Sequence, residues 1–517
     1  MHLAIIHYHL FPGGVTQVIA NHLRSLEMFL GKDCDHRIAV LHGGLPEDFQ
    51  NLGWEGSTNI EVSAHVIPGL GYDNWPETPL DSEALAKNII QELTRLNFPL
   101  SDSVIHVHNH SLGKNVSLPG ALRTISDFGY SLLLQVHDFA EDFRYEQYQR
   151  LKIALDGQSH QFHQTLYPQG GNIHYAVLNG RDRQVFSDCG VSEKRLHTLP
   201  NPIVDLGTLP SRDDVRGRMN QERGIPDKQP LITYPVRCIR RKNIGELLLW
   251  AALFKHQASF GATLAPHSNV EKPSYERWKS LATELQLPCH FELAETFSFK
   301  ENIAAADALI TTSVAEGFGM VFLESHLMGR LLLGRKLSEI TSDFENNGID
   351  LSALYPTLAI PVDFLGRDRI CKTVLAAYSE IIENFDAGDY WRGEATDALN
   401  RILATATVDF SLLTPQLQEE IIRMIVENTR FAQTILDNNP LLKKSIPLAG
   451  SQKILDHNAN AVRNNYAPLS TGEKMKSIYD QIIYSSHRER ADELVHAEKV
   501  LNAFLCLERF CPLRSMR

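Results

Sequence analysis

The chain has 517 residues, of which 43% are hydrophobic and 22% are charged. This length and composition predict a folded protein with at least two domains and exclude a disordered chain. The formal net charge is -12, which argues against a general nucleic-acid-binding protein and against a strongly basic membrane surface.

The cysteines and the first residues indicate the compartment. The seven cysteines are scattered, without a Cys-x-x-Cys pair, so a disulfide framework or a structural zinc site is not expected and a reducing compartment is favoured. The N-terminus does not resemble a signal peptide, and no stretch reaches the ~20 apolar residues of a membrane-spanning helix. We therefore expect a cytoplasmic protein without stable membrane insertion.

Short apolar runs alternate with helical patterns in the first part of the chain. A strand at Leu3–His7 leads through Phe11-Pro12-Gly13-Gly14 into apolar residues spaced three and four apart. A strand, a glycine turn and a helix form the opening unit of a doubly wound α/β domain. Further strands are expected at Arg37–His42, Ser103–His108, Ser131–Val136, His174–Leu178 and Leu196–Leu199.

The prolines at 200, 202 and 210 and the polar residues after them predict a domain boundary near 205–212. The alternation of strands and helices restarts at Leu231–Val236 and reaches a strand at Ala308–Thr312, and a long helical tract is expected at Leu412–Leu436. We thus predict an α/β domain at 1–205, a second at 206–465 and a helical tail at 466–517. Ligands of such sheets bind beyond the carboxyl ends of the strands, and a cleft between two such domains is the expected site.

One segment carries the strongest functional signal. The strand at Ala308–Thr312 leads into Glu316-Gly317-Phe318-Gly319-Met320, and a second carboxylate, Glu324, follows eight positions after the first. Glycines let the backbone approach a ligand closely, and the free N–H groups that open a helix suit a diphosphate. Glu324 could accept hydrogen bonds from vicinal hydroxyls such as those of a ribose.

This segment resembles the Glu-x7-Glu signature of the retaining GT-B glycosyltransferases, specifically of family GT4. The resemblance implies an α/β fold of two Rossmann-like domains facing across a cleft, with a C-terminal helical segment, here Tyr466 to Tyr484, crossing back onto the first domain. It also implies that Glu316 contacts the transferring sugar and that Glu324 contacts the ribose. Sugar hydroxyls and phosphate would then be held by the backbone of Gly317, Phe318, Gly319 and Met320.

A basic segment follows the strand at Leu231–Val236. Arg237 and Lys242 match the Arg-x4-Lys pair with which similar enzymes hold the leaving diphosphate, although Asn243 stands where the family usually has glycine. Fixed cations stabilise the negative charge that develops on that group. Because side chains would neutralise this charge, we expect no divalent metal and no cofactor besides the nucleotide-sugar cosubstrate.

The N-terminal half supplies further candidates by the same resemblance. Gly13 and Gly14 match the glycine loop under the donor phosphates, and His137 follows a strand at the place where similar enzymes bind the donor sugar. His108, Asn109 and Asp138 are candidates for the acceptor side.

Two other functions stay open at this point. His106, His108 and His110 alternate, so an extended backbone would place them on one face, as ligands of a metal-dependent hydrolase with His137 and Asp138 nearby. The second alternative is a nucleotide-sugar-binding protein that has lost its catalytic activity.

The preferred hypothesis is a retaining hexosyltransferase that moves a sugar from a donor of the UDP-glucose or GDP-mannose type to a small soluble hydroxyl acceptor. Front-face transfer, in which the leaving phosphate helps to deprotonate the acceptor, would retain the anomeric configuration. The region 337–439 is longer than the family core needs, and 489–517 resembles an added amphipathic helix. Either segment could form a homodimer contact or shape the acceptor pocket.

Overall fold

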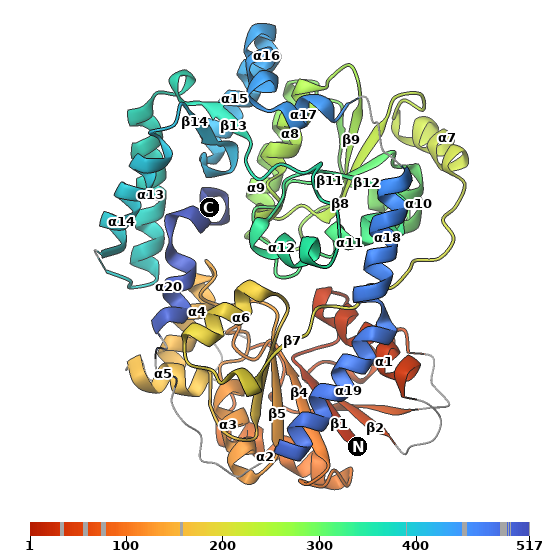
Figure 1. Cartoon of the computed structure of the whole chain (residues 1–517), viewed down its shortest axis with the longest axis vertical. Helices are drawn as coiled ribbons and strands as arrows, with labels where there is room; N and C mark the ends of the chain where they lie inside the picture. The colour runs from red at the N-terminus through yellow and green to blue at the C-terminus, as the bar shows by residue number, and fades with distance from the viewer. Residues whose placement is uncertain are drawn as a thin grey trace. The chain divides into compact units, whose positions relative to one another are not determined.

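The computed structural model describes residues 1–30, 36–54, 60–73, 79–155, 159–388, 390–446, 452–485, 494, 496 and 498–515. The chain divides into two compact units (Figure 1). Unit 1 comprises Met1–Val204 with Asn464–Phe504, and unit 2 comprises Asp205–Arg463 with Leu505–Arg517.

Unit 1 contains a seven-stranded parallel sheet in the order β3-β2-β1-β4-β5-β6-β7. The strand order reverses direction between β1 and β4, which is where open α/β sheets form a ligand crevice. The strands are β1 (His2–His7), β2 (Arg37–His42), β3 (Glu61–Val66), β4 (Ser103–His108), β5 (Ser131–Val136), β6 (Ile173–Val177) and β7 (Leu196–Thr198).

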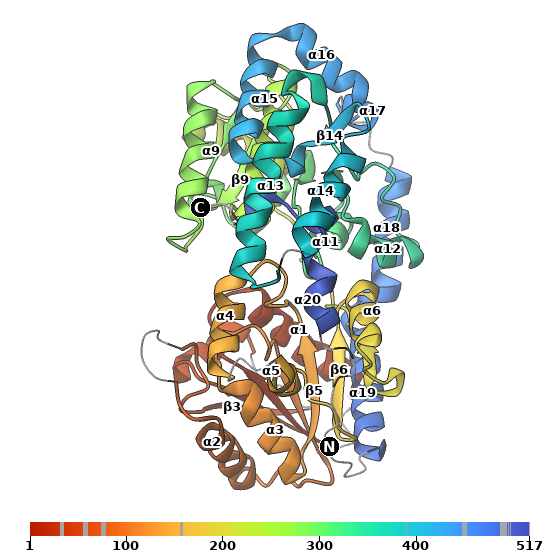
Figure 2. The ribbon, with the colours of Figure 1, turned by 90° about the vertical axis from the view of Figure 1, so that its left-hand side faces the viewer.

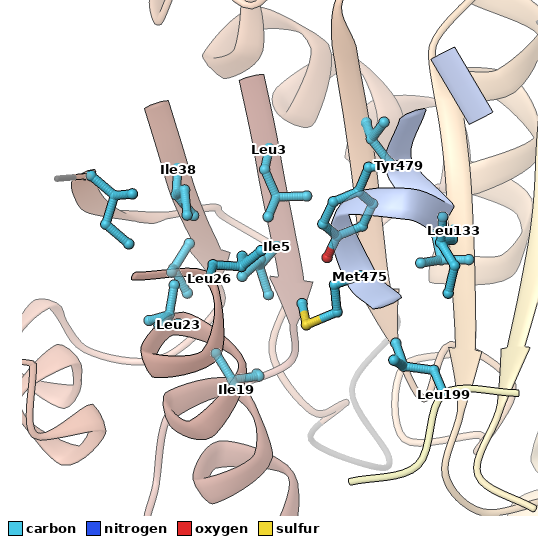
Figure 3. Packing of buried hydrophobic residues seen from close by; sticks show 14 of the residues in the cluster. Leu3, Ile5, Ile19, Leu23, Leu26, Ile38, Leu133, Leu199, Met475 and Tyr479 are labelled. Carbon is cyan, nitrogen blue, oxygen red and sulfur yellow. The ribbon is translucent and has the colours of Figure 1, made fainter. Parts of the chain in front are cut away.

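Helices connect these strands, and a C-terminal helix completes the unit. The helices are α1 (Gly14–Phe29), α2 (Ser82–Arg95), α3 (Leu118–Phe128), α4 (Tyr145–Ala154), α5 (Ser159–Leu166), α6 (Gly180–Asp188), α19 (Pro468–Ser485) and most of α20 (Glu498–Leu505). Figure 3 shows α1, β1 and α19 contributing to one hydrophobic cluster, with Ile19, Ile5 and Met475 among its members. A Cβ on Gly472 would lie 2.1 Å from the carbonyl oxygen of Ser25, so glycine permits the close approach of α19 to α1.

Unit 2 contains a five-stranded parallel sheet in the order β10-β9-β8-β11-β12 and a small antiparallel pair, β13-β14. The strands are β8 (Leu231–Arg237), β9 (Ser259–Leu264), β10 (Cys289–His290), β11 (Ala308–Thr311), β12 (Leu331–Gly334), β13 (Ala359–Pro361) and β14 (Thr407–Asp409). These two parallel sheets confirm the predicted α/β class with two Rossmann-like units.

The helices of unit 2 surround its sheet and extend beyond β12. They are α7 (Arg212–Arg223), α8 (Ile244–Leu253), α9 (Lys272–Glu284), α10 (Phe299–Ala305), α11 (Val321–Leu327), α12 (Ser338–Asn346), α13 (Arg367–Asn384), α14 (Tyr390–Ile402), α15 (Pro415–Glu427), α16 (Thr429–Asn438), α17 (Pro440–Lys444) and α21 (Pro512–Ser515), while α18 (Gln452–Tyr466) contains the boundary with unit 1. Figure 2 shows α13 and α14 side by side in the region 337–439 that exceeds the expected core.

One sequence prediction about helices is confirmed with a break, and another is wrong. The helical tract expected at Leu412–Leu436 is present as two helices, because Asn428 adopts an extended conformation (φ -134°, ψ 101°) and its side chain caps α16 by accepting from the N–H of Phe431. The single amphipathic helix expected at 489–517 is instead α20, a turn at Leu507–Arg509 and α21, broken where Cys506 and Phe510 are extended. Part of that segment, including 489–493, lies outside the described residues. Among the helices that the structure describes, none has the length and apolar character needed to cross a bilayer.

Candidate active site

Glu316 lies at the carboxyl edge of the unit 2 sheet, shortly after β11. Its side chain is only 8% exposed and forms ion pairs with Lys242 and with Arg241, whose Nη1 lies 3.0 Å from Oε2. The hydroxyl of Ser313 donates a third hydrogen bond to Oε1 at 2.6 Å. The carboxylate therefore has a fixed position between two cations.

Backbone contacts bring the basic segment to Glu316. The chain turns at Arg240–Lys242 and starts α8 after Asn243. The Thr312 hydroxyl donates to the carbonyl oxygens of Lys242 and Asn243 at 2.8 and 3.1 Å. Asn243 has a φ of 47°, in the left-handed region. Asparagine tolerates this region better than most residues, which explains how it can stand where the family usually has glycine.

The ionisation of Glu316 follows from these contacts. Burial alone would raise the pKa of this carboxyl, but the charges of Lys242 and Arg241 and the hydrogen bonds outweigh burial and hold the pKa at about 2. Glu316 is thus a buried carboxylate that stays ionised at neutral pH.

The conformation of the turn after Glu316 requires glycine at position 319. Gly319 has a φ of 80°, and a Cβ there would lie 2.7 Å from the ring of Phe322. Phe318 is buried against Phe344, with ring centroids 5.3 Å apart. Met320 is the residue that precedes α11, so Gly317 to Met320 form the connection between Glu316 and this short helix.

Glu324 lies on α11, half-buried, and its carboxyl makes no hydrogen bond or ion pair within the described part of the chain. Burial raises its pKa to about 7. The pKa of Glu316 is shifted in the opposite direction, although both carboxyls belong to the same motif, because no described cation lies beside Glu324.

The two members of the predicted Arg-x4-Lys pair have different partners in unit 2. Lys242 contacts Glu316, whereas Arg237 ends β8 and donates through Nη1 to the carbonyl oxygen of Ala265 at 3.0 Å. Arg241, which the sequence reasoning did not select, occupies the second cationic position beside Glu316. The run of adjacent basic residues at 240–242 was the available signal.

In unit 1, the candidates at the ends of β4 and β5 are joined by hydrogen bonds. His108 Nδ1 lies 2.8 Å from His137 Nε2, and Asn109 Oδ1 accepts from the backbone N–H groups of His137 and Asp138, both at 3.0 Å. Tyr8 donates to the carbonyl oxygen of Asn109 at 2.6 Å. Asn109 therefore holds the loop that carries His137, and His108 orients its ring.

The histidines of this edge are neutral. Burial lowers the pKa of His137 to about 4 and that of His106 to about 3, and it lowers the pKa of His108 well below the usual range. His106 is hydrogen bonded at both nitrogens, to the Tyr479 hydroxyl at 2.8 Å and to the Gln135 side chain at 2.9 Å. This arrangement ties α19 to two strands of the sheet.

The expectation that His106, His108 and His110 share one face is wrong for His110. β4 ends at His108, and Asn109 takes a φ of 63°, which ends the alternation. His110 Nε2 instead lies 2.9 Å from the carbonyl oxygen of Leu166. The third histidine near the other two comes from α1, since ring nitrogens of His22, His106 and His108 lie within 4.8 Å of one another. A histidine inside a helical apolar pattern gave no sequence signal for this contact.

Asp138 and the two N-terminal glycines complete the predicted set. Asp138 forms an ion pair with Arg144 at 2.6 Å. Gly13 is extended (φ -177°), and a Cβ on Gly14 would meet nothing within 4 Å. Neither the extended backbone of Gly13 nor the packing around the two positions requires glycine.

Comparisons with known proteins bear on this geometry. No protein-family model matches the chain. It is 24% identical over 537 residues to mannosylglucosyl-3-phosphoglycerate synthase of Petrotoga mobilis, covering 99% of each protein. Solved structures with a similar fold include HepE of Anabaena in complex with UDP-glucose (13% identity, TM-score 0.52, 93% of this chain and 99% of that one) and sucrose-phosphate synthase of Thermosynechococcus elongatus (14%, 0.53, 94% and 100%).

The relative matches along nearly its whole length, and the fold is that of the GT-B enzymes. In unit 2, Glu316 of the glutamate motif is held by Lys242, Arg241 and Ser313. Together these findings show that the chain has the GT-B fold and is similar along nearly its whole length to a mannosylglucosyl-3-phosphoglycerate synthase.

Proposed function

We propose that the protein is a metal-independent, retaining hexosyltransferase. It transfers a hexose from a nucleotide-diphosphate sugar of the UDP-glucose or GDP-mannose type to a hydroxyl of a small soluble acceptor. The observation that carries this proposal is the ionised Glu316, fixed by Lys242, Arg241 and Ser313 next to the glycine turn of Gly317 to Met320.

Unit 2 is proposed to bind the donor. The Glu324 carboxyl, which has no partner among the described residues, can accept hydrogen bonds from both ribose hydroxyls. Lys242 and Arg237 bind the diphosphate, and Glu316 accepts from hydroxyls of the transferring hexose. Lys242 forms an ion pair with Glu316 here, so a bound diphosphate would compete for its ammonium group and leave Glu316 oxygens available to the sugar.

The state of Glu316 favours front-face transfer over a covalent intermediate. A carboxylate that accepts from three side chains and has a pKa of about 2 is a weak base and a weak nucleophile. The leaving phosphate oxygen is then the base that takes the proton of the acceptor hydroxyl. The fixed cations stabilise the charge on that phosphate as the glycosidic bond breaks, and the acceptor adds to the face from which the phosphate departs.

Unit 1 is proposed to supply His137, held by His108 and Asn109. A neutral imidazole can hydrogen bond a sugar hydroxyl without adding positive charge close to a carbon that itself becomes cationic. The same edge carries the acceptor-side candidates His108, Asn109 and Asp138. The fully buried His108 acts through His137, whereas Asp138 is 29% exposed.

The name of the Petrotoga relative supports a hexosyl group and a small acceptor, since its product contains mannosyl and glucosyl groups on 3-phosphoglycerate. The HepE complex with UDP-glucose supports a nucleotide-diphosphate sugar as donor.

A thermal-shift screen against UDP, GDP and ADP, followed by proton NMR of the product formed from the matching sugar donor, tests this proposal. We expect one nucleotide to raise the melting temperature and the new anomeric bond to keep the donor configuration. An inverted product would contradict front-face transfer, and the absence of any nucleotide effect would contradict the donor site.

A further inference from the structure

Three basic side chains gather at the carboxyl edge of the unit 1 sheet. Lys114 lies in the loop after β4, Arg144 lies just before α4, and Arg150 lies within α4. All three are partly buried. They belong to the same edge as His137 and Asp138, since Asp138 pairs with Arg144 at 2.6 Å.

The fold fixes the position of Lys114 from two sides. Gly113 has a φ of 71°, and a Cβ there would lie 2.6 Å from the carbonyl oxygen of Gln147 on α4, so the loop packs directly against this helix. On the other side, the carbonyl oxygen of Lys114 accepts from the N–H of Asp73 at 2.9 Å. These two contacts fix the backbone of the loop at Lys114.

The ammonium group of Lys114 contacts no acidic side chain among the described residues. It lies 5.4 Å from the centroid of the Tyr72 ring and makes no hydrogen bond or ion pair with any residue that the structure describes. Burial lowers its pKa, and the charges of Arg144 and Arg150 lower it further, although the charge of Glu146 partly opposes them. A protein gains no stability from holding like charges together, whereas a bound anion would relieve both the repulsion and the desolvation.

We propose that Lys114, with Arg144 and Arg150, binds an acid group of the acceptor, so that the enzyme glycosylates an anionic acceptor carrying a phosphate or a carboxylate. This inference rests on the proposed function for the identity of the ligand as acceptor. Arg144 also orients Asp138, which couples the position of the acid group to the loop that carries His137. Lys114 is a positioning and specificity residue, because it contacts the acceptor away from the reacting hydroxyl.

The test uses the full chain and three small probes: glycerol 3-phosphate for a phosphate group, glycerate for a carboxylate, and glycerol as the uncharged control. Binding is measured by ligand-observed NMR and by calorimetry at low and high salt. We expect at least one acid to bind and glycerol not to bind, and the better acid identifies the group. Binding should weaken with salt, as for partly exposed charges.

The variant Lys114→Met keeps the aliphatic stem and removes the charge. We expect it to bind the preferred acid at least tenfold more weakly, with unchanged melting temperature and unchanged affinity for UDP or GDP. Lys87→Met, at an exposed position on α2, is the matched control and should behave like the wild type. In the transfer reaction, Lys114→Met should raise the KM for the acceptor and leave the KM for the donor unchanged.

Equal acid affinity of Lys114→Met and wild type would overturn the inference, as would the failure of both acids to bind. The possible outcomes distinguish a failure of the inferred anion site from a failure of the proposed function. Acid binding through Lys114 without any hexosyl transfer would contradict the function and leave the anion site standing. Nucleotide binding and transfer to uncharged acceptors alone would contradict the anion site and leave the function standing.

Discussion

The two parallel sheets have the same pattern of strand order, but the titratable groups buried at their carboxyl edges differ in charge. In unit 1, burial keeps the imidazoles of His106, His108 and His137 neutral. In unit 2, Glu316 is equally enclosed but stays ionised because Lys242 and Arg241 contact it. The difference is the presence of a fixed counter-charge, which decides whether burial or electrostatic attraction prevails.

This difference in charge suits the two edges to different parts of the substrates. Fixed charges suit a donor whose diphosphate departs as an anion, and neutral histidines suit hydroxyl groups beside a carbon that becomes cationic. Within unit 2 the same contrast separates the two glutamates of the motif. Glu316 has cationic partners and a pKa of about 2, whereas Glu324 has no cationic partner in the described part of the chain and a pKa of about 7.

The largest expected effect comes from removing the central charge of unit 2. Glu316→Gln keeps the shape and leaves Lys242 and Arg241 without their shared counter-charge. We expect kcat to fall by about 10²–10³, the range seen when one preorganised electrostatic group is lost, as measured by steady-state transfer. Circular dichroism should show a folded protein.

Ser313→Ala is the matched control, since it removes a neutral hydrogen bond to the same carboxylate at no change in charge. Its kcat should fall by about tenfold or less, in line with the ~1 kcal/mol of an ordinary hydrogen bond. Turnover of Glu316→Gln close to that of the wild type would remove Glu316 from the site.

The second prediction concerns the pH dependence of Glu324. Because its pKa is raised to about 7, the carboxyl is mostly ionised at pH 8 and mostly protonated at pH 6. Ribose hydroxyls donate more strongly to the ionised form, so the affinity for the nucleoside should fall by up to about tenfold between pH 8 and pH 6. Calorimetry with the nucleoside itself avoids the titration of phosphate groups.

Glu324→Gln provides the comparison for this pH effect. It cannot ionise, so its nucleoside affinity should be weak and independent of pH over the same range. A wild-type affinity that is flat between pH 6 and pH 8 would argue against Glu324 as the ribose ligand.

The third prediction tests whether His106 in unit 1 has a structural role. Tyr479→Phe removes the hydroxyl that reaches His106 and leaves a buried ring nitrogen without its partner. This should cost about 1–3 kcal/mol and lower the melting temperature by several degrees. Tyr484→Phe, on the same helix with an 85% exposed side chain, should leave the melting temperature unchanged, and equal melting of the two variants would count against this role.

The smallest expected effect is that of a chelator. Because Lys242 and Arg237 are proposed to neutralise the leaving diphosphate, dialysis against a strong chelator should leave the transfer rate within about twofold of its starting value. Loss of activity that zinc restores would instead point to a metal at His22, His106 and His108, whose nitrogens lie within 4.8 Å of one another.

Apolar runs predicted most of the parallel strands, because a strand covered on both faces must be apolar along its length, but they missed the partly exposed strand β3. The positions of side chains in the loops could not be predicted as well from the sequence. Asn109 changes the backbone direction and moves His110 away from His108, and the spacing rule favoured Arg237 over Arg241, although packing places Arg241 beside Glu316. The roles assigned to the site residues stay predictions.

A crystal soaked with UDP or GDP would examine the donor site directly. We expect the diphosphate beside Lys242 and the backbone of Gly317 to Met320, with the ribose hydroxyls on the Glu324 carboxyl. A nucleotide bound elsewhere, with the ion pair of Lys242 and Glu316 undisturbed, would contradict the proposal that this charged edge of unit 2 holds the activated sugar.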